Sequence, residues 1–310
     1  MLEEVVLWNA CGQPQSAWKD GRGRGPLIVL LHGFPDTEQT FLELAPLLVR
    51  AGYRVLLPRM RGYEPSTVQP DDQYYLWDLA EDVAAWLDHL GESQVHLIGH
   101  DFGALSAYVF AARYPDRLLS LTSLAIPPLR RIERGLVRVP GQVLKSSYLV
   151  LMQMPAQWSE RMMRMDDWRF LRLLWKRWSP DWNFTEAQWS RLKQAINKPG
   201  VARAASGYYR CLRNLNQRKG RQSWGALRQV PRVPTLLLTG VQDGCMDTRL
   251  YDAMVQPRDF TARVLTVRLP GCGHWLHRER PEDVLRIWLD FQQSLVQDQT
   301  FTEQDGTAHG

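Results

Sequence analysis

The chain has few of the features that mark secreted, zinc-binding or membrane-spanning proteins. It has only four cysteines among 310 residues, and they form no Cys-x-x-Cys pair, so we expect reduced thiols and neither a disulfide framework nor a zinc site. No stretch approaches the roughly 20 uninterrupted apolar residues of a membrane span. The first residues, Met-Leu-Glu-Glu, are acidic, which argues against a secretion leader. These absences predict a cytoplasmic globular protein.

Acidic residues are scarce in the middle of the chain. Between residues 129 and 222 only 6 acidic residues stand against 20 basic ones, a net charge of +14, whereas the whole chain carries +5. The region shows no clear strand pattern and holds six of the 13 tryptophans. The shift predicts a helical cap inserted into a core formed by 1 to 128 and 223 to 296. The polar stretch from 297 to 310 lacks periodicity, and we expect a disordered tail there.

Outside this middle region, apolar runs typical of buried strands alternate with helical patterns. Amphipathic helices are predicted at 75 to 90 and at 281 to 295. The strand-like runs lie at 27 to 31, 53 to 57, 95 to 98, 118 to 126, 233 to 238 and 264 to 269. Alternation of this kind is typical of a mostly parallel α/β sheet with helices on both faces.

The most informative pattern is Gly-His-Asp-Phe-Gly at residues 99 to 103, directly between a strand pattern and a helix pattern. It matches the nucleophile elbow Gly-x-Ser-x-Gly, in which small flanking residues permit a sharp turn that exposes the central side chain. Asp101 takes the place of the serine. A carboxylate is a weak nucleophile suited to displacement at a saturated carbon, which leaves an ester on the enzyme.

Two further candidate residues follow later strands. Asp243 comes after the run at 233 to 238, and His274 comes after the run at 264 to 269. Ligands of open α/β sheets bind at the carboxyl ends of the strands, so we expect both side chains to meet Asp101 there. In this arrangement Asp101 is the nucleophile, His274 the base and Asp243 the acid that orients it.

The motif His-Gly-Phe-Pro at 32 to 35 lies just past the first buried strand, where an oxyanion-binding loop is expected. We predict that the backbone N–H groups of Phe34 and Phe102 donate to the carboxyl oxygen of Asp101 when water attacks its ester. Each such donor is worth on the order of 3 kcal/mol. His32 and His100 lie beside the motifs and are predicted to be structural, and His277 is expected behind His274 or at the surface.

These motifs, with Gly273-His274 and the position of the helical region, resemble those of the α/β-hydrolase-fold epoxide hydrolases over about residues 27 to 295. The resemblance implies an α/β-hydrolase core with an inserted cap, and two cap tyrosines that donate hydrogen bonds to the epoxide oxygen. Matched position by position, these are Tyr148 and Tyr209, with Tyr208 the weaker match. The resemblance also implies hydrolysis of a small lipophilic epoxide by water to a vicinal diol, without a metal or organic cofactor.

The chemistry accounts for these residue types. Asp101 would attack a ring carbon while the tyrosines support the oxygen, because a phenol donates a proton without being ionised at neutral pH. His274, oriented by Asp243, would then activate the water that hydrolyses the ester. The residues expected to line the substrate pocket, which we predict to be wide and apolar, are Phe34, Phe102, Met152 and Trp275.

Two other classes of protein stay open at this point. A haloalkane or haloacid dehalogenase would use the same Asp101 and release halide without needing Tyr148 or Tyr209. Haloalkane dehalogenases usually follow the nucleophile with Trp, however, and Phe102 stands there in this chain. A hydrolase-derived binding protein with little turnover would not need an intact set of catalytic residues.

The charge pattern bears on partners other than the substrate. We expect no nucleic-acid partner, because no recognised motif accompanies the basic charge. The basic cap favours at most a weak peripheral attraction to anionic membranes. A homodimer is compatible with the sequence, which does not decide the oligomeric state.

Overall fold

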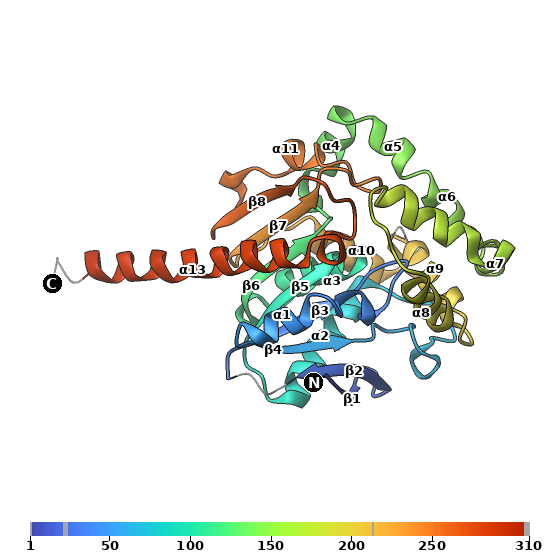
Figure 1. Ribbon diagram of the computed structural model, residues 1–310, viewed down its shortest axis with the longest axis horizontal. Coiled ribbons are helices and arrows are strands. Elements are labelled where there is room, and N and C mark those ends of the chain that lie inside the picture. Colours follow the sequence, from blue (N-terminus) through green and yellow to red (C-terminus); the bar gives the residue numbers. More distant parts are fainter. Residues whose placement is uncertain (1, 21–23, 213, 307–310) are drawn as a thin grey trace.

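The computed structural model describes residues 2–20, 24–212 and 214–306, without the side chains from residue 298 onward. One eight-stranded sheet runs through the molecule in the order β1-β2-β4-β3-β5-β6-β7-β8 (Figure 1). Its strands are β1 (Glu3–Trp8), β2 (Pro14–Asp20), β3 (Leu27–Leu31), β4 (Arg54–Pro58), β5 (Val95–His100), β6 (Leu118–Leu124), β7 (Thr235–Gly240) and β8 (Val264–Leu269). The six predicted strands are all present, and their neighbours pair in parallel from β4 to β8.

The two strands at the amino-terminal edge were not predicted. β1 pairs with β2, and β2 with β4, in antiparallel orientation. β1 is the edge strand, and most of its residues are at least partly exposed, so it shows no buried apolar run of the kind that marks β3. The sheet is therefore mostly parallel with an antiparallel edge.

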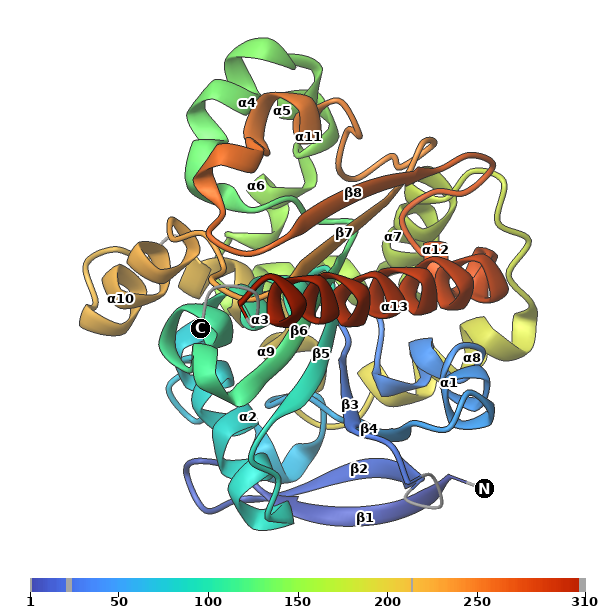
Figure 2. The same ribbon diagram turned by 90° about the vertical axis from the view of Figure 1, so that its left-hand side faces the viewer.

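Helices cover both faces of the sheet because alternate residues of each strand point to opposite sides. In β3, Leu27, Val29 and Leu31 join one hydrophobic cluster, and Ile28 and Leu30 join the other. Figure 2 shows α13 lying across one face, where α1 also packs, while α2 and α3 belong to the cluster on the other face. These helices, with two shorter ones, are α1 (Ala45–Arg50), α2 (Leu76–Leu90), α3 (Phe102–Arg113), α11 (Leu250–Met254), α12 (Leu276–Glu279) and α13 (Pro281–Gly306).

The middle of the chain is helical, as its sequence pattern indicated. The elements there are α4 (Ile132–Arg138), α5 (Gly141–Lys145), α6 (Tyr148–Met152), α7 (Ala156–Trp178), α8 (Glu186–Ile196), α9 (Val201–Leu212) and α10 (Arg218–Leu227). The backbone of α7 leaves helical geometry between Met165 and Trp168, so α7 is two helices joined by a kink. The division into a core and a cap domain stays a prediction.

Short 3-10 helices complete the regular structure, and the carboxyl-terminal helix is longer than expected. The 3-10 helices are η1 (Glu38–Phe41), η2 (Pro65–Thr67), η3 (Pro115–Arg117), η4 (Leu129–Arg131) and η5 (Pro257–Asp259). Helix α13 continues to Gly306 and projects from the body of the molecule (Figure 1), where a disordered tail was expected. Glutamine and glutamate are good helix formers, and extending an existing helix requires no new nucleation. Residues 307–310 lie outside the described part.

Among the described residues, none of the helices combines the length and the apolar character needed to cross a membrane.

Candidate active site

Asp101 occupies a strained turn between β5 and α3. Its φ of 52° and ψ of −118° lie in a region that side chains other than glycine rarely adopt, which is common at functional sites. Close packing around the turn requires glycine nearby. A Cβ atom on Gly33 would lie 2.4 Å from the Cβ of Asp101, and one on Gly103 would lie 2.0 Å from the carbonyl oxygen of Leu31. The structure therefore has the strand, turn and helix predicted from the motif.

The predicted acid and base meet Asp101 at the carboxyl ends of the strands. His274 Nδ1 lies 2.9 Å from Asp243 Oδ2, and His274 Nε2 lies 3.6 Å from Asp101 Oδ2. The Phe34 N–H donates to Asp101 Oδ1 over 2.9 Å. The three titratable residues are at most 5% exposed, so the group is shielded from water.

The loop after β7 holds the acid in place. Asp243 Oδ1 accepts hydrogen bonds from the backbone N–H groups of Cys245, at 2.7 Å, and Met246, at 2.8 Å. The other carboxylate oxygen is then left for His274 Nδ1. This arrangement orients the imidazole so that Nε2 points to Asp101.

Charge and hydrogen bonding outweigh burial in this group. Burial alone would lower the pKa of His274, but the charges and hydrogen bonds of Asp243 and Asp101 raise it from 6.5 to about 10. Burial alone would raise the pKa of Asp101, but the hydrogen bond and charge of His274 hold it below its ordinary value. The resting site is therefore an imidazolium between two carboxylates at neutral pH.

The two predicted tyrosines come together from different helices. Tyr148 begins α6 and Tyr209 lies in α9, and their ring centroids are 5.8 Å apart. The Tyr209 hydroxyl is buried and makes no hydrogen bond of ordinary geometry within the described residues. Burial and the nearby charge of Asp101 raise the pKa of both phenols well above 10, so both remain protonated donors.

The neighbouring tyrosine has a different role. The Tyr208 hydroxyl donates to the backbone carbonyl of Arg61 over 2.6 Å, so its donor is already used in holding α9 to the core. Both tyrosines pack edge-on against Phe102, and Tyr209 packs edge-on against Phe34 as well, so Tyr209 contacts both residues predicted to form the oxyanion hole. The geometry agrees with the preference for Tyr209 over Tyr208.

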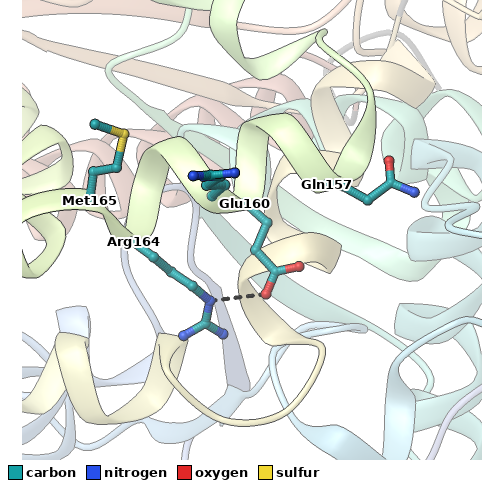
Figure 3. Close-up of a pocket in the computed structure, with 5 residues that line it drawn as sticks. Gln157, Glu160, Arg164 and Met165 are labelled. Atoms are coloured by element: carbon teal, nitrogen blue, oxygen red, sulfur yellow. Dashed lines mark hydrogen bonds and ion pairs between the residues drawn. The ribbon is translucent and has the colours of Figure 1, made fainter.

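Three hollows on the surface of the described part of the chain lie away from this group. One lies along α7 and is lined by Gln157, Glu160, Arg161, Arg164 and Met165 (Figure 3). Two others are lined by residues around Trp77 and around Trp182. None of these three hollows includes a predicted site residue, so the wide pocket expected beside Asp101 is not among them.

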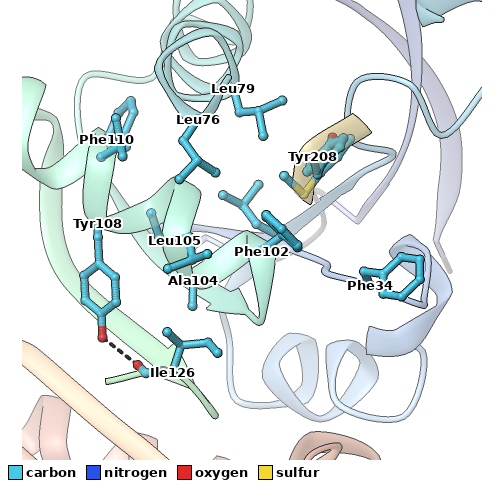
Figure 4. Close-up of a cluster of buried hydrophobic side chains, with 14 of the residues drawn as sticks. Phe34, Leu76, Leu79, Phe102, Ala104, Leu105, Tyr108, Phe110, Ile126 and Tyr208 are labelled. Atoms are coloured by element: carbon cyan, nitrogen blue, oxygen red, sulfur yellow. Dashed lines mark hydrogen bonds between the residues drawn. The ribbon is translucent and has the colours of Figure 1, made fainter. Parts of the chain in front are cut away.

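The predicted pocket walls are instead packed closed. Phe34, Phe102 and Met152 are at most 3% exposed and belong to one hydrophobic cluster, part of which Figure 4 shows around Phe34, Phe102 and Tyr208. Apolar residues thus surround Asp101, and side chains would have to move for a substrate to reach it. The role of the Phe102 N–H as an oxyanion donor stays a prediction.

Trp275 lies in an aromatic cluster beside His274, and its place in a pocket wall stays a prediction. Its indole N–H donates to Asp36 Oδ2 over 2.9 Å, and its ring stacks on Trp178 and Trp182. Trp275 follows His274 directly, and its ring packs edge-on against the His274 ring, with centroids 5.1 Å apart, within an aromatic cluster that includes Trp178 of α7. Its observed contacts are structural.

The histidines beside the motifs have structural partners. His32 accepts a hydrogen bond from the Met60 N–H at Nε2, and His100 Nε2 lies 3.0 Å from the His274 carbonyl oxygen. His277 is fully buried rather than at the surface, with Nε2 2.7 Å from Thr40 Oγ1.

One residue at the site had been given no role. Asp101, Cys245 and His274 offer ligand atoms that all lie within 4.8 Å of one another. The Cys245 Sγ also lies 3.6 Å from the Tyr148 hydroxyl. Carboxylate, thiolate and imidazole are a donor set that zinc accepts, so these three residues could together hold a metal ion. Cys245 stands two residues after Asp243, and that spacing was the available signal.

A carbonyl from α7 also fixes the site and was not anticipated. The Trp178 carbonyl oxygen accepts from the backbone N–H of Gly244, at 3.0 Å, and from that of His274, at 3.1 Å. A Cβ on Gly244 would lie 2.0 Å from the Arg177 carbonyl oxygen, so only glycine permits this approach. One peptide group thus holds the acid loop and the base together, and main-chain packing of this kind leaves no side-chain motif.

Comparison with a known family agrees with this architecture. Residues 26–281 match a family model described as alpha/beta hydrolase fold. The predicted α/β-hydrolase fold is therefore confirmed.

Individual relatives share the same range of the chain. The AB hydrolase superfamily protein YfhM of Bacillus subtilis (strain 168) is 31% identical over 276 residues, covering 87% of this chain and 91% of the relative. Epoxide hydrolase 3 of Mus musculus is 29% identical over 284 residues, covering 89% of this chain and 73% of the relative. The crystal structure of epoxide hydrolase A from Mycobacterium thermoresistibile superposes with a TM-score of 0.76 at 24% identity, covering 94% of this chain and 98% of that one.

Proposed function

The chain belongs to the alpha/beta hydrolase fold family, and we propose that it is an epoxide hydrolase that works through a covalent ester on Asp101. The observation that carries the proposal is the pairing of an aspartate at the elbow with two protonated phenols, the buried Tyr209 and the partly buried Tyr148. A relative that is 29% identical is named epoxide hydrolase 3, which agrees with this assignment. The proposed substrate is a small lipophilic epoxide, because the residues around Asp101 are apolar.

In the first step, a carboxylate oxygen of Asp101 attacks a ring carbon and the carbon–oxygen bond of the epoxide breaks. The oxygen that leaves would be an alkoxide, and a phenol proton from Tyr148 or Tyr209 neutralises it. The resulting phenolate recovers its proton from the His274 imidazolium, directly or through solvent. The products of this step are an ester on Asp101, a neutral imidazole and a protonated phenol, so charge and protons balance.

The ester then makes His274 a base. Esterification removes the charge of Asp101, which is one of the two carboxylates that raise the His274 pKa in the resting site. Neutral His274 takes a proton from water, and the hydroxide attacks the carbonyl carbon of the ester. The Phe34 N–H, already bonded to Asp101 Oδ1, stabilises the charge on that oxygen. Release of the diol restores the carboxylate and the imidazolium.

The test is diol release from aryl, alkyl and fatty-acid epoxides by the parent and three variants. We expect Asp101→Asn to release no diol, because an amide cannot form the ester. The Tyr148→Phe/Tyr209→Phe double variant should lose about 100-fold or more in kcat/KM. Tyr208→Phe is the matched control, since its hydroxyl bonds to the Arg61 carbonyl, and it should keep its activity.

Two results would contradict the proposal. Absence of diol from every epoxide, with halide released from haloalkanes by the parent and by the double variant, would assign the site to dehalogenation. Full activity of the double variant toward epoxides would mean that Tyr148 and Tyr209 have only a packing role and donate no proton to the epoxide oxygen.

A further inference from the structure

Helix α5 presents its apolar side chains to the outside. Gln142 is 2% exposed, and its side chain donates to the Cys245 carbonyl and accepts from the Asp247 N–H. Val143 and Leu144, by contrast, are 61% and 73% exposed. A helix at the surface of a globular protein ordinarily shows the reverse arrangement, with apolar residues toward the core. The inversion indicates that the outer side of α5 faces something other than water.

The apolar surface continues along the two neighbouring helices. Val137 in α4 is 80% exposed, and Val150 in α6 is 72% exposed. Helices α4, α5 and α6 follow one another along one edge of the molecule (Figures 1 and 2). We call the outer surface formed by Val137, Val143, Leu144 and Val150 the α4–α6 margin. Large exposed apolar side chains gathered on three successive helices are a feature of interaction sites.

The charge beside the margin is positive. Arg134 and Arg138 lie in α4, and within the described residues neither forms an ion pair. Glu133, the acidic residue of α4, is paired with Arg228. If two copies of the chain met through this margin, the arginines of one copy would lie near those of the other, and their like charges would repel. The complementary partner is therefore an anionic surface with an apolar interior.

The inner side of the same helices touches the candidate site. The Lys145 ammonium donates to the Asp243 carbonyl oxygen over 2.6 Å and lies 3.4 Å from Asp247 Oδ2. Tyr148 begins α6. Movement of α5 would therefore shift the loop that holds Asp243 and the predicted proton donor Tyr148. Such movement matters because the side chains around Asp101 are packed closed in the structure.

We propose that the α4–α6 margin docks on the surface of an anionic lipid bilayer and that apolar substrate enters beside Tyr148 from that bilayer. Valine and leucine side chains insert among the lipids while Arg134 and Arg138 meet the head groups, and the two contributions reinforce each other. The docking rests on the exposed residues alone, and the route of entry rests on the proposed function.

The experiment is co-sedimentation of the full chain with vesicles of phosphatidylcholine alone or mixed with phosphatidylglycerol. The parent should sediment with the mixed vesicles, less so at high salt, and hardly with phosphatidylcholine alone. Val143→Asp/Leu144→Asp should lower the bound fraction about tenfold, since apolar insertion is lost and like charge is added. Val6→Asp is the matched control, because Val6 is 56% exposed on β1 at the opposite end of the molecule (Figure 2).

Three outcomes would overturn the docking: no binding of the parent to the mixed vesicles, equal loss in the Val6→Asp control, or a dimer in light scattering that only the margin variant dissociates. The last result would make the margin an interface between copies. Diol release from a water-soluble epoxide without vesicles is measured in the same samples and tests the proposed function separately. Vesicle binding without diol would contradict only the function, and diol without vesicle binding only the docking.

Discussion

Single residues at the site are held in states that they would not adopt alone. Asp101 has an unfavourable backbone conformation and is buried as a charged group, and His274 is a buried imidazolium. Each is stabilised by the other and by Asp243, whose own loop supplies two backbone donors. The site is therefore an ion triad whose stability depends on the proton of His274.

That proton predicts how stability changes at alkaline pH. The His274 pKa is raised from 6.5 to about 10 on folding, so the folded state binds more protons between these values. The contribution of the His274 proton to the free energy of unfolding is complete below about pH 6.5 and is lost as the pH rises toward 10. Urea unfolding of the parent from about pH 7 to about pH 9.5 should show a falling free energy of unfolding. His274→Gln should flatten this dependence, and equal slopes in both proteins would contradict the triad.

The candidate residues Asp101, Asp243 and His274 were predictable because each follows a strand in a recognisable local pattern, whereas the two helical tyrosines came from the resemblance to a family. The order Asp101, Asp243, His274 and the Tyr148 and Tyr209 matches were available from the sequence, and the structure brings all five side chains to one place. The place of Trp275 in a pocket wall stays a prediction, since proximity in sequence to His274 does not decide what a large ring packs against. Cys245 was missed because its spacing of two residues from Asp243 belongs to no recognised motif and the cysteines are otherwise scattered.

At the scale of elements, the connection from α7 into the catalytic loops is a main-chain contact. The Trp178 carbonyl holds both the acid loop and His274, and Gly244 and Gly273 permit the close approach. The strands could be predicted because the apolar runs of β3 to β8 are local signals, even in β8, where most residues are at least partly exposed. The contact at Trp178 could not, since it depends on how α7 packs against loops that are distant in sequence.

This contact predicts the effect of a single methyl group. In Gly244→Ala the new Cβ would meet the Arg177 carbonyl oxygen at 2.0 Å, so the loop or α7 must move. We expect a loss of about 1–3 kcal/mol in the free energy of unfolding and a larger fall in kcat than rise in KM. Gly225→Ala is the matched control, because its Cβ would meet nothing within 4 Å and alanine favours helix α10. Similar stability of both variants in urea would contradict the proposed packing.

At the scale of the whole molecule, several histidines are buried without charge. Burial lowers the pKa of His32 to about 4, of His96 to about 4 and of His100 to about 3. Between its lowered pKa and about pH 6.5, each of these histidines is protonated in the unfolded chain but not in the folded one, so its contribution to stability falls as the pH falls through this window. Together with His274, this predicts maximal stability near neutral pH.

The fall in the free energy of unfolding below neutral pH can be measured by urea unfolding at about pH 7 and about pH 5. Each buried neutral histidine should cost about 1.4 kcal/mol per pH unit inside its window. His96→Asn should reduce the dependence of the unfolding free energy on pH by the contribution of one histidine. His96 is suited to this test because it packs near Trp288, away from Asp101, Asp243 and His274. A slope unchanged by this substitution would show that His96 is not neutral in the folded state.

The account's central claim is that Asp101 forms an ester which water then hydrolyses at its carbonyl carbon. The most direct test is a single turnover, with enzyme in excess over epoxide, in water enriched in oxygen-18, followed by mass spectrometry of the peptide that contains Asp101 and of the diol. We predict that the heavy oxygen enters the Asp101 carboxylate and that the diol of the first turnover contains none. Heavy oxygen in the diol and none in the peptide would mean that water opens the epoxide directly, and the assignment of Asp101 as nucleophile would be wrong.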